Sequence, residues 1–415
     1  MTWRVNADRL AEEIARFGRI GATTDGGVTR LVFSEAEGEA VRLLADLLRA
    51  EGLSTRTDGV GNLFGLRRGS APGLPVLMIG SHLDTVPHGG RFDGALGVIA
   101  ALEVVRVLGE RGIETRHPVE VVCFRGEEAA RFGLGCLGSA AMAGVLEADR
   151  LLGAGDANGV TGEAALRAAG LSPEGIGQAI RPPAEVAAFV ELHIEQGRVL
   201  EAGGEQAGIV TDGANYTRLK VTVTGQADHS GTTPMALRRD ALLAASEMAL
   251  AVEEAVGALG EAPSVGTVGV LRVLPCAVNV VPGRVDFEVD VRDVDFDRKA
   301  RIVGRIRERV EEIARRRRVE AAAEMPVDGH PVKVSDRIVE TIRRAAGDLG
   351  LRTRAMTSGA GHDALRLAPV LPAGMIFVPS RDGRSHCPEE HTDLQAVAPG
   401  VELLLETVLR LDRDG

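Results

Sequence analysis

The residues of this sequence that could do chemistry gather in a few glycine-bearing segments. Seven of the nine histidines lie in these segments or in DHSGTTP (228–234), beside aspartate and glutamate. Mixed imidazole and carboxylate ligands suit divalent transition metals, and one shared carboxylate can bridge two ions about 3.5 to 4 Å apart. The pattern therefore indicates a hydrolase with two metal ions. The segments are GSHLDTVPHGGRFDG (80–94), FRGEEAARFG (124–133), ELHIEQG (191–197), GAGHDA (359–364) and GRSHCPEEHTD (383–393).

Two of these segments suggest particular roles for single residues. In HLD, Asp84 lies on the same side of an extended chain as His82, so its carboxylate could accept the second ring proton and fix the tautomer. The alternative for Asp84 is a loop cap. Glu127 and Glu128 are adjacent at a strand end and point in different directions, so one could bind metal while the other stays free as a base. The pair could also be two solvated surface glutamates.

The hydrophobic pattern places these segments at the ends of buried strands. Apolar runs at 75–80, 118–124 and 186–192 predict strands, with a helix over 94–110 between the first two. This order predicts a largely parallel α/β sheet with helices on both faces, and ligands bind at the carboxyl ends of such strands. Further helices are expected over about 7–17, 35–51, 334–348 and 394–411, and a strand over 374–378.

A second pattern begins near residue 212, where apolar and polar residues alternate as in half-exposed strands. The expected strands cover 217–225 and 284–293, and the expected helices that follow them lie near 238–256 and 297–316. This is typical of an α+β domain with helices on one face. We therefore predict a domain of residues 212–328 inserted into a catalytic domain made of residues 1–211 and 329–415.

Composition excludes several classes of protein. The chain has 415 residues, 45% hydrophobic and 26% charged, which is typical of folded domains of roughly 100 to 200 residues each. A formal net charge of −11 and 3% aromatic residues argue against binding to nucleic acid or to an anionic membrane. The N-terminal stretch is charged where a signal peptide would be apolar, so we expect a cytoplasmic protein. Four cysteines without C-x-x-C spacing are expected to be free thiols.

The motifs, in order along the chain, resemble a known family. They are G-S-H-L-D-T-V-P-x-G-G-x-F-D-G, G-E-E-x-x-R-F, E-L-H-I-E-Q-G, H-S-G-T-T-P-M, V-N-V-V-P-G, S-G-A-G-H-D-A and S-H-x-P-x-E. Together they resemble the amidase, hydantoinase and carbamoylase group of the metal-dependent aminoacylase and carboxypeptidase superfamily. Members of this group hydrolyse a ureido C–N bond next to a carboxylate. One departure is Ser230 in HSG, where many relatives have alanine, and it leaves the site assignment intact.

The resemblance implies a role for each residue at a motif position. It implies that Asp93 bridges two divalent ions, of Zn, Mn, Co or Ni, and that Glu127 is the general base, with Asp84 and His229 also catalytic. The implied metal ligands are His82, Asp93, Glu128, His193 and His386. The implied substrate contacts are Gln196, Asn279, Arg292, Gly359 and Ala360, and the inserted domain is implied to act as a lid and to pair in a homodimer. His88 and His391 occupy no motif position and are not counted as ligands.

Three classes of function fit the residues. The first is a two-metal amidohydrolase acting on a small ureido acid, the second a metallopeptidase or aminoacylase with the same metal core, and the third a non-catalytic metal-binding or ligand-binding protein. A free carboxylate beside the metals weakens the third, because a closed structural site has no use for one. DVRD (290–293) resembles the carbamoylases, so we expect an N-carbamoyl-L-amino-acid hydrolase, with allantoate amidohydrolase and β-ureidopropionase as alternatives.

Overall fold

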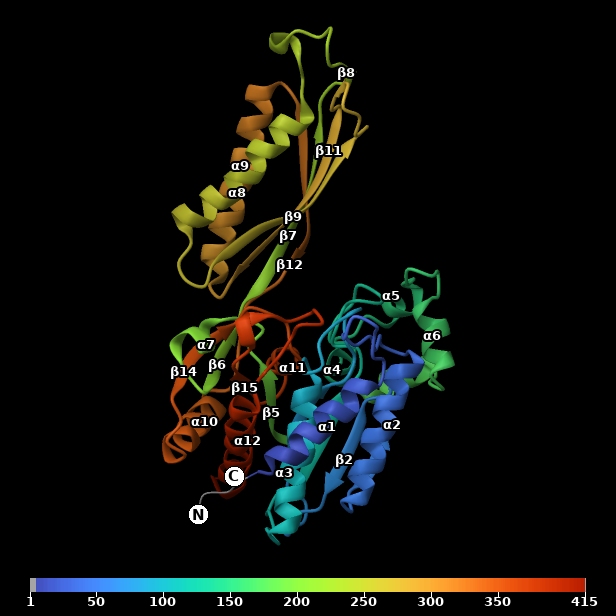
Figure 1. Cartoon of the computed structure of the whole chain (residues 1–415), viewed down its shortest axis with the longest axis vertical. Coiled ribbons are helices and arrows are strands. Elements are labelled where there is room, and N and C mark those ends of the chain that lie inside the picture. The colour runs from blue at the N-terminus through green and yellow to red at the C-terminus, as the bar shows by residue number, and fades with distance from the viewer. Residues whose placement is uncertain (1–4, 415) are drawn as a thin grey trace. The chain divides into compact units, whose positions relative to one another are not determined.

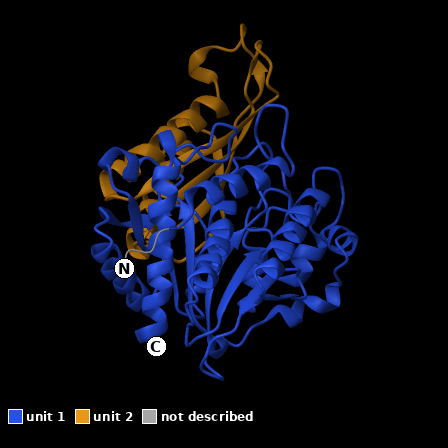
Figure 2. Cartoon of the chain, turned by 60° about the horizontal axis from the view of Figure 1, so that its bottom comes forward, with its two compact units in different colours: residues 1–211, 333–415 blue, residues 212–332 orange. Residues whose placement is uncertain are grey.

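The chain folds into two compact units. The structure, a computed structural model, describes residues 5–414, so the outer limits predicted at residues 1 and 415 lie outside the described residues. Unit 1 combines the segments up to residue 211 and from residue 333, and unit 2 is the insertion 212–332 (Figure 2). Among residues 5–414, no helix is both long and apolar enough to span a membrane.

Unit 1 is built on a nine-stranded mixed sheet with the strand order β1-β2-β4-β3-β5-β15-β6-β13, and β14 pairs with β6. Its strands are β1 (Ser54–Thr57), β2 (Leu63–Arg67), β3 (Val76–His82), β4 (Val119–Phe124), β5 (Val186–Ile194), β6 (Ala207–Gly213), β13 (Val332–Lys333), β14 (Thr353–Ser358) and β15 (Ala373–Val378). The four central strands β4, β3, β5 and β15 are parallel, and β2 and β6 flank them antiparallel.

Helices cover both faces of this sheet, as the sequence predicts (Figure 1). Alternate strand side chains such as Ile79 and Val121 pack against α1, α2, α3, α10 and α12, while Met78 and Val122 face the side of α4 and α11. The helices are α1 (Ala7–Arg19), α2 (Glu35–Ala50), α3 (Ala95–Glu110), α4 (Leu137–Met142), α5 (Ala148–Gly153), α6 (Gly162–Ala168), α7 (Val199–Gly203), α10 (Asp336–Asp348), α11 (Asp363–Leu367) and α12 (Leu394–Asp414).

The predicted elements are confirmed within a few residues. Helix α1 begins after Asn6, whose side chain accepts the N–H of Arg9 as an N-cap. The sheet is less parallel than expected. Its outer strands form antiparallel pairs, such as β1 with β2, whose short runs carry no continuous apolar signal.

Unit 2 has a four-stranded antiparallel sheet of order β12-β7-β11-β9 with two helices on one face. Burial alternates along β11, where Val285, Phe287, Val289 and Val291 face the helices. The elements are β7 (Asn215–Thr224), β8 (Asp228–His229), α8 (Ala241–Leu259), β9 (Val265–Leu274), β10 (Val280–Val281), β11 (Arg284–Asp293), α9 (Phe296–Arg317) and β12 (Glu320–Asp328).

The second boundary of unit 2 falls at residue 332, after the predicted limit of 328. Hydrogen bonds hold the extra residues to unit 2: Gly329 donates its N–H to the carbonyl of Tyr216, and Asn215 Nδ2 donates to the carbonyl of His330 at 2.8 Å. The hydrophobic pattern does not show such contacts, because they are polar and join the two ends of the insertion.

Candidate metal centre

The five residues predicted as metal ligands come together in unit 1. His82 ends β3, Asp93 lies in the loop before α3, and Glu128 follows β4. His193 lies near the end of β5, and His386 is in the loop after β15. Parallel strands end at the same edge of the sheet, which is why segments so distant in sequence meet there.

Their donor atoms form two groups that share Asp93. His82, Asp93 and His193 make one group and Asp93, Glu128 and His386 the other, with the ligand atoms of each group within 4.8 Å of one another. Asp93 Oδ1 lies 3.6 Å from His82 Nε2 and 3.3 Å from His193 Nε2, while Asp93 Oδ2 lies 3.4 Å from His386 Nε2. Each carboxylate oxygen of Asp93 therefore faces a different group, which is the geometry of a bridging ligand.

The chemistry of these donors fits divalent ions. His82 Nε2 is fully buried and has no hydrogen-bond partner within residues 5–414, which is unusual for a buried polar atom. The other nitrogens of both buried imidazoles face backbone carbonyls, His82 Nδ1 that of Asp84 and His193 Nδ1 that of Ile194, at 3.0 and 2.9 Å. Both Nε2 atoms are thereby turned toward Asp93: His82 Nε2 has no hydrogen-bond partner among the described residues, and His193 Nε2 accepts the N–H of Gly94 at 3.2 Å.

The charges of the centre are set by the crowded carboxylates. Hydrogen bonds to Asp93 and then to Glu128 raise the pKa of His386 to about 11. Burial opposes a positive charge on His193, yet its contact with Asp93 raises the pKa of His193 above the ordinary value. Without metal, His386 therefore holds a proton in the neutral range that a divalent ion must displace.

The Asp84 side chain has a different partner from the one expected. Its carboxylate lies 3.6 Å from His82 Nδ1, and it is the backbone carbonyl of Asp84 that lies within hydrogen-bonding distance of that nitrogen. The carboxylate instead accepts the backbone N–H groups of Glu127 and Glu128, at 3.1 and 3.0 Å. Asp84 thus fixes the turn that carries both glutamates, because its side chain satisfies two amides that the strand no longer pairs.

Glu127 lies beside the ligand groups without belonging to either. Its Oε2 is 3.8 Å from His82 Nε2, and the thiol of Cys136 donates a weak hydrogen bond to its Oε1 at 3.7 Å. Burial raises the pKa of Glu127 well above its ordinary value, against the opposing effect of His82. A carboxylate with a raised proton affinity next to a metal centre suits general base catalysis.

The centre contains polar residues besides the five ligands, and the sequence analysis missed two of them, Ser385 and Glu390. Gln196, expected to contact substrate, donates from Nε2 to Asp93 Oδ2 at 2.7 Å, and Ser385 Oγ lies 2.7 Å from the same oxygen. Glu390 accepts the N–H of Asp93. The motif S-H-x-P-x-E contains both Ser385 and Glu390 and was the one signal that could have found them.

A buried polar layer lies next to His193. Glu191 accepts from Ser81 Oγ at 2.6 Å and from the N–H of Ala364 at 2.8 Å. The ring of His362 lies 4.4 Å from that of His193. Gly359 and Ala360, predicted substrate contacts, lie just before His362 in the loop between β14 and α11, where Ser358 Oγ donates to the Ala360 carbonyl.

The three remaining predicted residues lie in unit 2 and do not come together there. β8 pairs with β10, His229 opposite Val280, and the Asn279 carbonyl accepts the N–H of Ser230, so His229 and Asn279 are neighbours. Figure 1 shows β8 at one end of unit 2. Arg292 lies near the far end of β11, and the step from Arg284 to Arg292 spans roughly 26 Å of strand.

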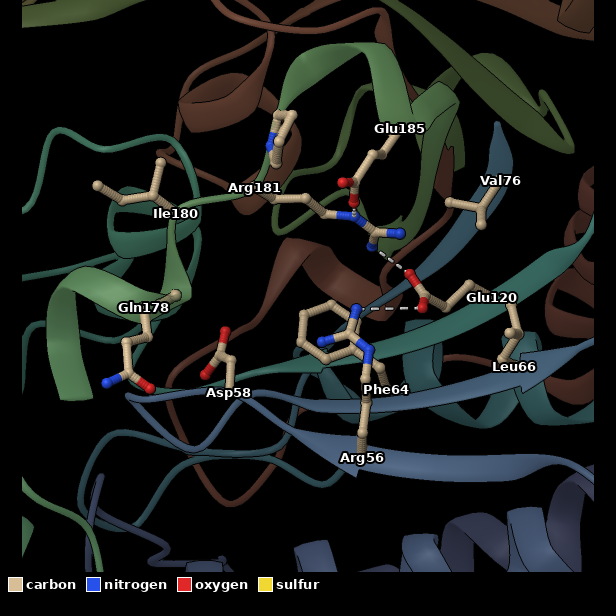
Figure 3. Close-up of a pocket in the computed structure, with 12 residues that line it drawn as sticks. Arg56, Asp58, Phe64, Leu66, Val76, Glu120, Gln178, Ile180, Arg181 and Glu185 are labelled. Atoms are coloured by element: carbon tan, nitrogen blue, oxygen red, sulfur yellow. Dashed lines mark hydrogen bonds and ion pairs between the residues drawn. The ribbon is translucent and has the colours of Figure 1, made fainter. Parts of the chain in front are cut away.

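A separate pocket of about 360 Å³ lies at the opposite edge of the unit 1 sheet (Figure 3). Its lining includes Val76 and Glu120, which stand at the amino ends of β3 and β4, away from the ligand-bearing carboxyl ends. Arg56 and Arg181 both pair with the buried carboxylate of Glu120, and Arg56 lies over the ring of Phe64. These ion pairs compensate the buried charge of Glu120, so the charged residues of the pocket need no ligand to account for them.

Donor sets that share one carboxylate, with a free glutamate beside them at the carboxyl edge of parallel strands, define a metal-dependent hydrolase. Comparison with known proteins places the chain within this class. It belongs to peptidase family M20/M25/M40, whose family model matches residues 78–410, and within it to the hydantoinase and carbamoylase amidases.

Two curated relatives and one solved structure illustrate the similarity. The chain is 44% identical to an N-carbamoyl-L-amino acid amidohydrolase of Geobacillus stearothermophilus, over 98% of this chain and 99% of that one. It is 38% identical to a ureidoglycolate hydrolase of Oryza sativa subsp. japonica, over 98% and 85%. A crystal structure of an amidase of the hydantoinase/carbamoylase family from Burkholderia multivorans matches with a TM-score of 0.90, 38% identity and 99% coverage of both chains.

Metal affinity should rise with pH, because a bound ion must displace the proton that His386 holds in the metal-free protein. His386, with a pKa of about 11 in the metal-free protein, is protonated throughout the neutral range. We expect the Kd for Zn²⁺ or Mn²⁺ to fall up to about tenfold per pH unit for each proton released. Calorimetric titration in buffers of different ionisation enthalpy counts those protons.

Two variants control this measurement. His386→Ala should bind metal more weakly and release about one proton fewer. His88→Asn changes an exposed imidazole that pairs with Asp25 outside the centre, and it should leave the proton count unchanged. A Kd that does not change with pH would contradict the protonation of the metal-free centre.

Proposed function

We propose that this protein is a two-metal amidohydrolase that cleaves the ureido C–N bond of N-carbamoyl-L-amino acids, giving the L-amino acid, CO2 and ammonia. The observation that carries the proposal is the carboxylate of Asp93, whose two oxygens face two separate ligand groups beside the free carboxylate of Glu127. The curated relative at 44% identity is named for this substrate class.

The five ligands would hold two divalent ions, of Zn, Mn, Co or Ni, since imidazole and carboxylate together suit all of these. When bound, such ions polarise a carbonyl and make water more acidic. Glu127 would accept a proton from the attacking water and return it to the leaving nitrogen. The Asp84 carboxylate accepts the backbone N–H groups of Glu127 and Glu128, and the thiol of Cys136 donates to the Glu127 carboxylate. These contacts hold that carboxylate in place for both proton transfers.

Arg292 is proposed to bind the carboxylate of the substrate. Its Nε donates to Asp290 at 2.8 Å and its guanidinium lies 5.6 Å from the ring of Tyr216, so the side chain is held in one orientation. A planar guanidinium held in this way suits bidentate recognition of a carboxylate. Asn279 and His229 would then contact the ureido group, with His229 stabilising negative charge that develops on the carbonyl oxygen. Gln196, Gly359 and Ala360 are proposed to complete the substrate contacts from unit 1.

The length of β11 supports the proposal of a homodimer. His229 and Asn279 lie roughly 26 Å or more along the strand direction from Arg292, much farther than one small ureido acid can reach. We therefore propose that a second copy supplies His229 and Asn279 to the site, and that unit 2 acts as lid and dimerisation domain. The edge strand β9 exposes Val265, Leu271 and Leu274, and an apolar edge strand is a natural pairing surface.

We also propose that the protein acts in the cytoplasm. The cysteines Cys123, Cys136, Cys276 and Cys387 are all free, as expected for a reducing compartment. Its partner molecules are then small ureido acids and a second copy of itself. Allantoate and N-carbamoyl-β-alanine are the alternative substrates within the same chemistry, and an aminoacylase or peptidase activity is the alternative outside it.

A substrate panel tests the proposed reaction. Ammonia release should be fastest with N-carbamoyl-L-amino acids, slower with allantoate and N-carbamoyl-β-alanine, and absent with N-acyl amino acids and dipeptides. Arg292→Ala should lose most of the preference for N-carbamoyl amino acids over their uncharged amides, because that preference depends on the guanidinium. Fastest turnover of dipeptides would replace the proposal with a peptidase.

The role of the base is tested by Glu127→Gln. Loss of a positioned base costs about a hundredfold to ten-thousandfold in kcat, while metal content and substrate affinity should be retained because Glu127 belongs to neither ligand group. Single-turnover rates and metal analysis of the same sample separate the two effects. A variant with near-normal turnover, or one that lost its metal, would assign the base elsewhere.

The shared site is tested by mixing subunits. Co-expressed Glu127→Gln and His229→Ala chains should regain about a quarter of wild-type activity, because half of the dimers are mixed and each mixed dimer has one complete site. The matched control pairs Glu127→Gln with His193→Ala, two changes in unit 1 that leave no complete site in any dimer. No recovery in the first mixture would show that His229 acts in its own subunit.

A further inference from the structure

We propose that Glu390 is a positioning residue that holds the Asp93 loop and the His386 loop of the metal centre in register. This inference rests on the proposed metal centre, and it adds a residue that binds neither metal nor substrate. Its basis is a set of hydrogen bonds between two loops that are almost 300 positions apart, one carrying the bridging carboxylate and the other carrying a ligand of the second group.

On the Asp93 side, Glu390 binds the backbone. Its Oε1 accepts the N–H of Phe92 at 2.8 Å and that of Asp93 at 3.0 Å. The contact is so close that Gly90 must lack a side chain, since a Cβ there would lie 1.9 Å from Glu390 Oε1. These two bonds fix the peptide from which the Asp93 carboxylate projects, and therefore the direction in which its oxygens face.

On the His386 side, Glu390 is linked through Ser385. The hydroxyl of Ser385 lies 2.7 Å from Glu390 Oε2 and 2.7 Å from Asp93 Oδ2, so it bridges the two carboxylates. His386, the next residue, has a φ of 58°, a left-handed backbone conformation that is uncommon for residues other than glycine. Such a conformation persists only when surrounding contacts enforce it, and the Ser385 bridge is the contact adjacent to it.

Glu390 is not itself a ligand in this arrangement. One of its oxygens accepts two amides, the other faces Ser385, and neither falls within the ligand groups of Asp93. The side chain is buried, at 3% exposure, so removing its partners or shortening its reach would leave unpaired polar groups beside the metal centre. Outer partners of this kind typically change metal affinity about 10 to 100-fold when they are altered.

Three substitutions separate positioning from charge. Glu390→Gln keeps the reach, still accepts both amides through its carbonyl oxygen, and can donate to Ser385. Glu390→Asp keeps the charge and shortens the side chain by one methylene, so it cannot span the two loops. Glu390→Ala removes both. Glu389→Ala is the matched control, because Glu389 is exposed and pairs with Arg384 on the surface.

The measurement is a Co²⁺ titration of the metal-free full-length protein followed by its visible absorption, with circular dichroism to verify folding. We expect Glu390→Asp and Glu390→Ala to lose at least about tenfold in Co²⁺ affinity, and Glu390→Gln and Glu389→Ala to stay within about threefold of wild type. If Glu390→Ala does not fold, the comparison of Glu390→Asp with Glu390→Gln decides. Wild-type affinity in Glu390→Asp, or a loss in Glu390→Gln as large as in Glu390→Asp, would overturn the proposal.

The affinity readout does not depend on the reaction. A wild type that binds Co²⁺ but hydrolyses no ureido acid would refute the proposed function while leaving the role of Glu390 to be decided by the same titrations. A wild type that binds no Co²⁺ would overturn the metal centre and the role of Glu390 together.

Discussion

The carboxylate of Asp93 must face two ligand groups at once, and much of unit 1 serves that requirement. Asp93 lies in the loop before α3, while its imidazole neighbours come from β3, β5 and the loop after β15. A rigid sheet can place the strand residues to a fraction of an ångström, but the two loops have no strand ladder to hold them. Their hydrogen bonds to one another supply the order that the sheet does not provide.

The sequence predicts the strands that carry His82 and His193 because each of these histidines stands at the end of a continuous apolar run. A strand that is buried on both faces of a sheet produces such a run. The sequence predicts poorly which polar side chains form hydrogen bonds with one another. The expectation that the Asp84 carboxylate contacts His82 follows from two-residue alternation, yet that carboxylate turns to the amides of Glu127 and Glu128. The Glu390 contact joins residues 297 positions apart, so no local pattern contains it.

In unit 2, the length of the extended strand β11 determines how far apart the predicted substrate-binding residues lie. Its alternating pattern predicts the antiparallel sheet and the covered face correctly, since every second residue of β11 faces the helices. The same strand separates Arg292 from His229 and Asn279, although all three are expected to contact one small substrate. Sequence motifs give these residues without the distances between them, so the proposal that a second copy supplies His229 and Asn279 draws on the length of the strand.

Buried acidic side chains in and around the metal centre link metal binding to the stability of the folded chain. Burial raises the pKa of Glu127 and of Glu390, and it raises that of Asp363 to about 7. Each of these shifts means that ionising the group in the folded chain costs free energy, which the unfolded chain does not incur. Two divalent ions would add four positive charges among these acids and offset that cost. The burial of these acids therefore destabilises the metal-free site and also contributes to its affinity for cations.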